Sequence, residues 1–388
     1  MPTESVKSSG KRPPSLGRLA CRGLRFRCLK LTGAAARPQA LSLELTRRCI
    51  ARCLMCNIWQ TPRDLPELSA GEWLEVFASP MLGDLRELDV TGGEPFLRRD
   101  LVEIFEGICC LKPDRFPRLS SIAVTTNGFL TDLILTDVKA LLPALERQGI
   151  GLVFAFGLDA VGPLHDRIRG FPGGWEKLEA TIRGLAALRE DHPGLVLGAK
   201  TTVTRHNAGE LEEIARFADR HRMFTIVSPY ILTPARYANL DLGETLSLSP
   251  EDREALRRFY QSPRFRWSYY RRELLHYLEE GRMKKPCTAG FNYYFLRSNG
   301  DLSPCPLREE VVGNVRTMPL ETLMSSHRAA RFRRGVGRFP ECAACTEPGL
   351  ARYALPFEGF YYLRLFFQLG PKDFRELHGH LGLDKYFS

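Results

Sequence analysis

Three cysteines near the start of the chain are spaced closely enough to hold one metal cluster. They are Cys49, Cys53 and Cys56, in the run Thr-Arg-Arg-Cys-Ile-Ala-Arg-Cys-Leu-Met-Cys-Asn. A structural zinc site takes four closed ligands, and a disulfide framework takes an even number of cysteines. Three thiolates suit a [4Fe–4S] cluster in which one iron has no protein ligand. The spacing therefore predicts an iron–sulfur cluster with one iron open for chemistry.

The run resembles the signature of the radical S-adenosylmethionine (radical SAM) enzymes, whose open iron chelates the amino and carboxylate groups of SAM. The family often has an aromatic residue before the third cysteine, where this chain has Met55, whose flexible thioether fills similar space. The resemblance implies reductive cleavage of SAM to methionine and a 5′-deoxyadenosyl radical, which removes a hydrogen atom from a substrate. It also implies an electron donor such as flavodoxin or ferredoxin.

A second cysteine set lies near the other end of the chain and comprises Cys287, Cys305, Cys342 and Cys345. Four thiolates with a terminal C-x2-C suit either a closed zinc site or a fully ligated [4Fe–4S] cluster. Their order, with Gly-Asn-Val at 313–315 between the second and third cysteines, resembles the SPASM extension of radical SAM proteins. That extension carries auxiliary clusters, and because the later cysteine run of the full pattern is missing, we expect one auxiliary [4Fe–4S] cluster.

Short apolar runs alternate with helical patterns between the two cysteine sets. The predicted strands are 41–45, 87–90, 121–125, 151–158, 196–203 and 224–228. The predicted helices are 100–110, 131–148, 175–190 and 208–221, with Asp100, Thr131 and Asn207 as expected N-caps. Such alternation predicts a parallel sheet with right-handed crossovers. The expected α/β fold is a partial (β/α)6 TIM-like barrel followed by a small cysteine-rich SPASM/twitch-like domain.

In a β/α barrel the reactive groups lie at the carboxyl ends of the strands. The cysteine loop follows the first predicted strand, and Gly92-Gly93-Glu94-Pro95 follows the second. Adjacent glycines let the backbone approach a ligand closely, and proline stiffens the end of the turn. This segment is similar to the GGEP turn of radical SAM proteins, which contacts the amino group of SAM. Glu94 is expected to accept a hydrogen bond from an ammonium group or to anchor the loop.

The ends of the next three strands carry polar residues that the resemblance implies as SAM contacts. These residues are Asn127, Asp159, Arg169, Thr204 and Asn207. Arg169, or Arg167 in its place, would pair with the SAM carboxylate, because a guanidinium fork matches it; either arginine is otherwise a surface ion-pair partner. Asn207 has the alternative role of a helix N-cap. Gly157 stands where the family frequently has a serine, so a hydroxyl expected at that strand end is missing.

The net charge of +10 is unevenly distributed, with nine Lys or Arg and no acid from Val6 to Leu43. Within this segment the apolar residues recur at helical spacing. A basic amphipathic helix suits peripheral contact with anionic lipid, and the alternative is a helix that packs under the barrel. No run of 18 apolar residues or signal peptide appears, and no nucleic-acid module is recognised. We therefore expect a cytoplasmic protein.

The expected division of the chain is a basic extension, a radical SAM barrel, a helical connector, a SPASM-like domain and an aromatic tail. Their ranges are 1–38, 39–235, 236–280, 281–350 and 351–388. The favoured substrate is a small metabolite, lipid or glycan precursor, because only about 40 residues precede the first strand. The alternatives are a peptide- or protein-modifying radical SAM maturase and a non-catalytic metal-binding scaffold protein.

Overall fold

The computed structural model describes residues 13–62 and 64–387. All strands of this part of the chain belong to one continuous nine-stranded sheet. Its strand order is β6-β5-β4-β3-β2-β1-β7-β8-β9. The first six strands are all parallel: β1 Ala40–Thr46, β2 Glu87–Gly92, β3 Ser121–Thr126, β4 Gly151–Gly157, β5 Leu195–Val203 and β6 Phe224–Pro229. The six predicted strands and the partial barrel are thus confirmed.

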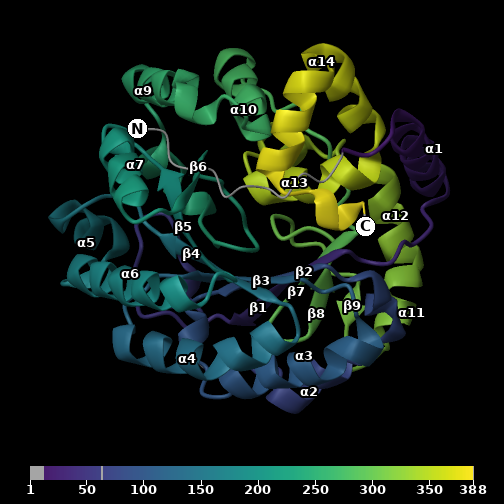
Figure 1. The fold of residues 1–388 in the computed structure, drawn as a ribbon, viewed down its shortest axis with the longest axis horizontal. Coiled ribbons are helices and arrows are strands. Elements are labelled where there is room, and N and C mark those ends of the chain that lie inside the picture. Colours follow the sequence, from purple (N-terminus) through teal and green to yellow (C-terminus); the bar gives the residue numbers. More distant parts are fainter. Residues whose placement is uncertain (1–12, 63, 388) are drawn as a thin grey trace.

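Helices follow the strands and cover one side of the curved sheet. They are α2 Ala70–Phe77, α3 Leu101–Arg115, α4 Thr131–Arg147, α5 Pro163–Arg169, α6 Gly174–Asp191 and α7 Leu211–Arg220. Figure 1 shows α2, α3, α4 and α6 along this side. Alternate strand residues such as Leu43, Val90 and Val124 are buried against these helices. Residues of the opposite parity, such as Thr91 and Lys200, face the inside of the barrel, so polar groups are directed toward its centre.

Two of the expected N-caps are wrong. Helix α4 begins at Thr131 itself, so its N-cap is Leu130. Helix α7 begins at Leu211, and its N-cap is Glu210, which lies three residues after Asn207. Asp100 does occupy the N-cap position of α3 but makes no capping hydrogen bond, because its carboxylate pairs with Arg98 at 2.6 Å.

The cysteine-rich region extends the barrel sheet, which the sequence patterns do not reveal. Strand β7 (Tyr293–Leu296) pairs in parallel with β1, and β8 (Asp301–Ser303) and β9 (Gly313–Asn314) follow in antiparallel pairing. The helices α8 Gly243–Leu246, α9 Pro250–Gln261 and α10 Tyr269–Glu280 precede β7, whereas α11 Leu320–Ser325 and α12 His327–Gly335 follow β9. Short 3-10 helices span Ile58–Gln60, Pro80–Asp84, Pro95–Leu97, Leu240–Leu242, Pro263–Phe265, Pro340–Ala344 and Asp384–Tyr386.

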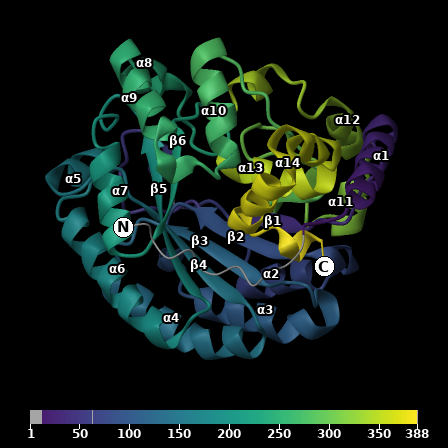
Figure 2. The same cartoon turned by 45° about the horizontal axis from the view of Figure 1, so that its top comes forward.

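The two ends of the described chain pack against each other on the inner side of the sheet. Helix α1 (Leu16–Thr32) lies against α12, α13 (Pro348–Glu358) and α14 (Phe360–Leu381), as both views show (Figures 1 and 2). The C-terminal segment reaches the amino end of β2, where Arg352 pairs with Glu87 at 2.8 Å. Lys385 and the hydroxyl of Tyr386 contact the same carboxylate. These contacts close the floor of the barrel.

Helix α1 confirms the predicted helix, but its packing partners are α12 to α14 rather than the underside of the barrel. The first twelve residues of the basic extension lie outside the described residues. None of the helices in the described part of the chain has both the length and the apolar character needed to span a bilayer.

Candidate cofactor site

The three cysteines of the first set line one cavity at the carboxyl end of the barrel. The same cavity is lined by Gly92, Gly93, Asn127, Gly157 and Arg169, which follow or end three different strands. Parallel strands bring their carboxyl ends to one edge, so residues more than 100 positions apart share this space. Of the residues predicted from the first four strands, the three cysteines, Gly92, Gly93, Asn127 and Arg169 are thus brought together.

Backbone hydrogen bonds hold the cysteine loop to its neighbours. The N–H groups of Arg52 and Leu54 donate to the carbonyl oxygens of Arg169 and Ile168, both at 2.9 Å. On the other side, the N–H of Asn57 donates to Tyr237 O at 2.9 Å. The loop is thus fixed between α5 and the segment that follows β6, and the three sulfur positions do not depend on a bound cluster alone.

Gly92 and Gly93 are required by a close approach to the cysteine loop. A Cβ at Gly92, whose φ is +125°, would lie 2.2 Å from Thr46 O, and a Cβ at Gly93 would lie 2.1 Å from Arg48 O. The N–H groups of Gly93 and Glu94 donate to these same oxygens, each at 2.8 Å. The turn therefore packs directly against the residues that lead into Cys49, and both glycines still face the cavity.

Glu94 ties the end of β2 to the end of β3. Its fully buried carboxylate accepts hydrogen bonds from the Asn127 N–H and the Thr126 hydroxyl, both at 2.8 Å. Burial raises the pKa of Glu94 to about 7, although these hydrogen bonds oppose the rise. Neither Glu94 nor the buried Pro95 lines the cavity. The anchoring role expected for Glu94 is what the geometry provides, and its contact with SAM stays a prediction.

Asn127 has an unused donor at the cavity wall. Its Oδ1 accepts from the Phe129 N–H at 2.9 Å, whereas its buried Nδ2 has no hydrogen-bond partner within the described residues. A buried amide without a partner costs free energy. This Nδ2 is therefore suited to donate to a polar ligand, as the sequence predicts.

Arg169 lies between Asp159 and the cysteine loop. Its Nη2 pairs with Asp159 Oδ2 at 2.7 Å, and its Nη1 lies 3.7 Å from the Cys53 sulfur. Asp159 is fully buried behind the cavity wall and also accepts from the Thr202 N–H at 2.8 Å. Although burial opposes the charged form, the Asp159 carboxylate raises the pKa of Arg169, so the guanidinium stays positive. Asp159 therefore orients Arg169, whose guanidinium lines the cavity.

Steric contact with Arg169 explains why residue 157 is a glycine. A Cβ at this position would lie 2.2 Å from Nη2 and 2.6 Å from Cζ of Arg169. The guanidinium thus occupies the space that the expected serine side chain would need. The absence of a serine side chain at position 157 therefore leaves the space that Arg169 occupies.

Thr204 and Asn207 lie behind the cavity wall rather than in it. Asn207 Nδ2 donates to Asp159 O at 2.8 Å and Thr202 O at 3.1 Å, and its Oδ1 accepts from the Thr204 N–H at 2.8 Å. Because all its polar groups bind protein, Asn207 joins the ends of β4 and β5. The cavity wall is instead formed by Lys200 and Thr202 of β5, which the sequence analysis does not single out.

A segment after β6 completes the cavity and is also missing from the predicted site. Its lining residues are Tyr230, Ile231, Arg236, Tyr237 and Asn239. Asn239 Nδ2 donates to Met55 O at 2.8 Å, and Arg236 Nη2 donates to the Thr91 hydroxyl at 3.2 Å. The segment therefore covers the cysteine loop and binds β2. The concentration of aromatic and basic residues directly after the sixth strand was the available sequence signal.

The thiols of the first set resist ionisation without a cluster. Burial raises the pKa of Cys49 and of Cys56 to about 12, and the neighbouring sulfur of Cys53 adds to both rises. The N–H groups of Ala51 and Ile58 donate to the sulfurs of Cys49 and Cys56 and oppose this effect. Cationic iron would offset the cost of holding three thiolates here.

The four cysteines of the second set also converge. Burial raises the pKa of Cys305, and the thiols of Cys287, Cys345 and Cys342 each raise it further. Backbone N–H groups donate to the sulfurs of Cys287 and Cys305, and Phe332 and Phe339 belong to the apolar cluster around them. None of the four lines the cavity described above.

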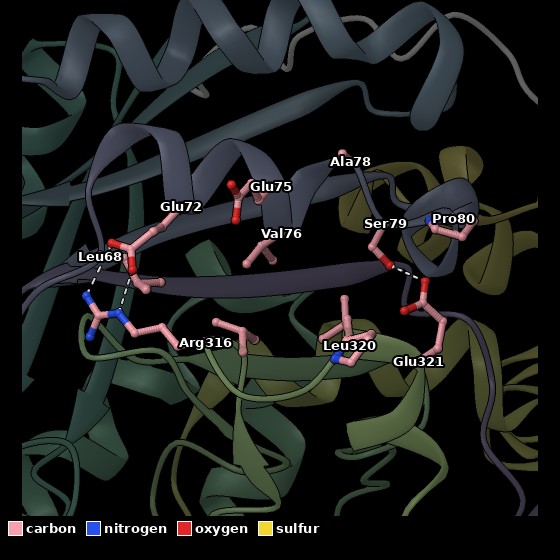
Figure 3. Close-up of a pocket in the computed structure, with 12 residues that line it drawn as sticks. Leu68, Glu72, Glu75, Val76, Ala78, Ser79, Pro80, Arg316, Leu320 and Glu321 are labelled. Carbon is pink, nitrogen blue, oxygen red and sulfur yellow. Dashed lines mark hydrogen bonds and ion pairs between the residues drawn. The ribbon is translucent and has the colours of Figure 1, made fainter.

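A separate hollow lies between α2 and the segment that enters α11 (Figure 3). Arg316 Nε pairs with Glu72 Oε1 at 2.6 Å across it, and Ser79 donates to Glu321 at 2.7 Å. The hydrogen bond from Arg316 lowers the pKa of Glu72 to about 2. The hollow contains no thiol, and its polar contacts join the barrel to the cysteine-rich region.

Both cysteine sets fit iron–sulfur clusters by their donor chemistry. Each brings half-buried thiols together, and backbone N–H groups reach the sulfurs, as is usual around such clusters. No group of Cys, His, Asp and Glu in residues 13–62 and 64–387 is arranged for a single metal ion. A cluster of four irons takes one ligand at each iron, so its thiolates stand farther apart than those of one ion.

Comparison with known proteins places both regions in families. Residues 43–220 match the radical SAM superfamily, and residues 287–346 match SPASM, an iron–sulfur cluster-binding domain. Together these matches cover more than half of the chain. They establish that the chain binds SAM and [4Fe–4S] clusters, whereas the assignment of Cys49, Cys53 and Cys56 as ligands of the SAM-binding cluster stays a prediction.

Individual relatives agree with this assignment. A PqqA peptide cyclase of Rhizobium meliloti is 31% identical over 185 residues, which is 47% of this chain and 44% of that protein. The chain thus matches less than half of that relative's length. An AdoMet-dependent heme synthase of Nitratidesulfovibrio vulgaris is 25% identical over 79% of this chain and 84% of that protein.

A solved structure supports the fold. Streptococcus suis SuiB bound to the precursor peptide SuiA superposes with a TM-score of 0.56 at 16% identity, over 86% of this chain and 76% of that one. The cavity with three cysteines, the parallel barrel and the two family matches lead to one conclusion: the chain belongs to the radical SAM superfamily and carries a C-terminal SPASM domain.

Proposed function

We propose that this protein is a radical SAM maturase that modifies a peptide. The observation that carries the proposal is the similarity to a PqqA peptide cyclase, at 31% identity over 185 residues. This similarity favours a peptide over the small metabolite, lipid or glycan precursor that the sequence analysis put first. When bound, the open cluster and SAM supply a reductive cleavage that yields methionine and a 5′-deoxyadenosyl radical.

The chain's own residues bind and orient SAM in this proposal. Gly92 and Gly93 leave the backbone open to the amino group, and Asn127 Nδ2 donates to a polar group of the ligand. Arg169, already oriented by Asp159, faces the carboxylate. Hydrogen bonds and an ion pair within the protein hold each of these groups in position, which limits the ordering that binding requires.

The segment after β6 excludes water and presents groups to the substrate. Tyr230 and Tyr237 offer apolar faces, and the Arg236 guanidinium lies 5.4 Å from the Tyr237 ring centroid. Lys200 also lines the cavity and has no ion pair or side-chain hydrogen bond among the described residues. Its ammonium acts on the buried carboxylates of Glu347 and Asp159, and a cationic group beside aromatic rings suits a peptide that carries a carboxylate.

The test uses anaerobically reconstituted protein with reductant, SAM and synthetic peptides encoded by short reading frames beside its gene. We expect 5′-deoxyadenosine and a peptide whose mass changes, with deuterium from side-chain-labelled peptide appearing in 5′-deoxyadenosine. The matched control is the Cys49→Ala/Cys53→Ala/Cys56→Ala variant. Turnover of a heme-precursor tetrapyrrole instead of peptides would overturn the proposal in favour of the reaction named for the heme synthase relative.

A further inference from the structure

Helix α1 is firmly attached to the molecule through one face. Leu19, Gly23 and Phe26 on this face are buried. A Cβ at Gly23 would lie 2.4 Å from the ring of Phe360, so α1 and α14 are in direct contact at this residue. Lys30 adds a hydrogen bond to Val336 O at 2.8 Å. The position of α1, and therefore of its opposite face, is set by this packing.

The opposite face is apolar although it faces solvent. Leu24 is 62% exposed and Leu31 is 80% exposed, and the side chains of Cys21 and Cys28 are also exposed. These four residues follow one another at intervals of three or four positions, so they form a single stripe along the helix. Exposed leucines in a row at this spacing indicate an interaction surface rather than isolated surface residues.

Basic side chains flank the stripe on both sides. Arg18 and Arg25 lie on one side and Arg27 on the other, by helical spacing. The helix contains no Asp or Glu, and these three arginines form no ion pair within the described residues. The Glu358 carboxylate interacts electrostatically with Arg27 and with Lys30. The surface is thus apolar at its centre and positively charged at its edges.

The neighbouring helix α12 extends the positive surface. Its Arg328, Arg331 and Arg334 are exposed, and Arg334 Nη1 donates to Thr32 O at 3.3 Å at the end of α1. Figures 1 and 2 both show α1 and α12 side by side at the periphery of the molecule. The basic groups therefore belong to one continuous edge formed by two segments some 300 residues apart.

We propose that this edge docks on the surface of an anionic lipid bilayer. Leu24 and Leu31 would enter the boundary between headgroups and acyl chains, while the flanking arginines reach lipid phosphates. A bilayer fits better than a protein partner because positive charge surrounds the apolar stripe and no acid on α1 interrupts it. The buried face stays on α12 to α14, so docking needs no unfolding of the helix.

The test is flotation of the reconstituted full-length protein with vesicles of phosphatidylcholine, with and without about one third phosphatidylglycerol. We expect binding only to the anionic vesicles, weakened by high salt because exposed charges are screened. Leu24→Glu/Leu31→Glu should abolish it, and Arg18→Gln/Arg25→Gln should weaken it by about fivefold for each arginine. The matched control, Leu133→Glu/Leu240→Glu, changes two leucines that are exposed elsewhere and should bind as the wild type does.

Two results of the flotation experiment would overturn the proposal. One is absence of wild-type binding to anionic vesicles. The other is equal binding by the Leu24→Glu/Leu31→Glu variant whose circular dichroism matches the wild type. Light scattering of the lipid-free protein tests whether the stripe instead binds a second copy of the chain. A dimer that the Leu24→Glu/Leu31→Glu variant converts to a monomer would assign the stripe to self-association.

Discussion

The two cysteine regions contain the same ligand type in opposite surroundings. The three-cysteine loop borders a cavity with Gly93, Asn127 and Arg169, whose backbone, amide and guanidinium groups face a ligand. The four-cysteine set packs among aromatic side chains such as Phe332 and Phe339 and does not reach that cavity. The two regions differ in the number of thiols and in access to the cavity, which suits a reactive cluster in the first region and a closed one in the second.

The largest expected effect is the loss of SAM cleavage in Cys49→Ala/Cys53→Ala/Cys56→Ala. Iron should fall from about eight to about four per chain, because only the second set keeps a [4Fe–4S] cluster. The measurements are iron content, electron paramagnetic resonance with and without SAM, and 5′-deoxyadenosine formation. Cys21→Ser/Cys28→Ser, which changes two exposed thiols, is the control and should keep all three properties. An iron content of the triple variant equal to that of the wild type would contradict the assignment of one cluster to each cysteine region.

The converse variant, Cys342→Ala/Cys345→Ala, tests the second region. We expect about four irons per chain and a retained spectroscopic response to SAM, but loss of peptide product, since the altered region no longer holds its cluster. The same iron and resonance measurements, with product detection by mass spectrometry, check this. Loss of the SAM response in a folded variant would mean that the two regions do not act separately.

A smaller effect is expected from Gly157→Ser. The new side chain would meet the Arg169 guanidinium, which the Asp159 carboxylate holds in place, so the arginine has to move from the cavity wall. Losing one charge-assisted hydrogen bond should weaken SAM binding by about tenfold. Equilibrium binding of SAM to reconstituted protein measures the change. Gly209→Ala serves as the control, because a Cβ there meets no atom within 4 Å; tighter binding by the serine variant would show that the hydroxyl outweighs the displacement.

The smallest effect is a pH dependence of the cluster-free protein. Burial raises the pKa of Glu94 to about 7, so the folded state holds the proton more tightly than the unfolded state does. Protonated Glu94 therefore contributes up to about 3 kcal/mol to the free energy of unfolding. This contribution is complete below about pH 4.5 and is lost as the pH rises to about 7. Urea unfolding at pH 5 and pH 8 should show a steeper loss for the wild type than for Glu94→Gln. Parallel losses in both proteins would assign the dependence to other buried acids.

Much of this site follows from sequence because the motifs are local. The motifs Cys49 to Cys56 and Gly92 to Pro95 each lie within one short connection. The alternation of strands and helices predicts that the carboxyl ends of the strands before them lie side by side. Asn127 and Arg169 follow from the same rule and do line the cavity. Local spacing and strand order were therefore enough for these residues.

The remaining residues depend on contacts that no local pattern records. Thr204 and Asn207 lie just beyond the correct strand, where the chain has already turned, whereas Lys200 and Thr202 within the strand line the cavity. Arg236 and Asn239 reach the site through an irregular segment whose path is set by hydrogen bonds to Thr91 and Met55. The pairing of β7 with β1 joins residues about 250 positions apart, and short strands of this kind carry weak sequence signals.

The floor of the barrel has a consequence for synthesis on the ribosome. Glu87 begins the second strand, yet its partners Arg352 and Tyr386 are translated about 265 and 299 residues later. Until then a carboxylate destined for burial has no cation beside it, and an unpaired buried charge is costly. The barrel floor must therefore stay hydrated or open until residues 352–386 have been translated, long after the strand whose carboxylate they cover.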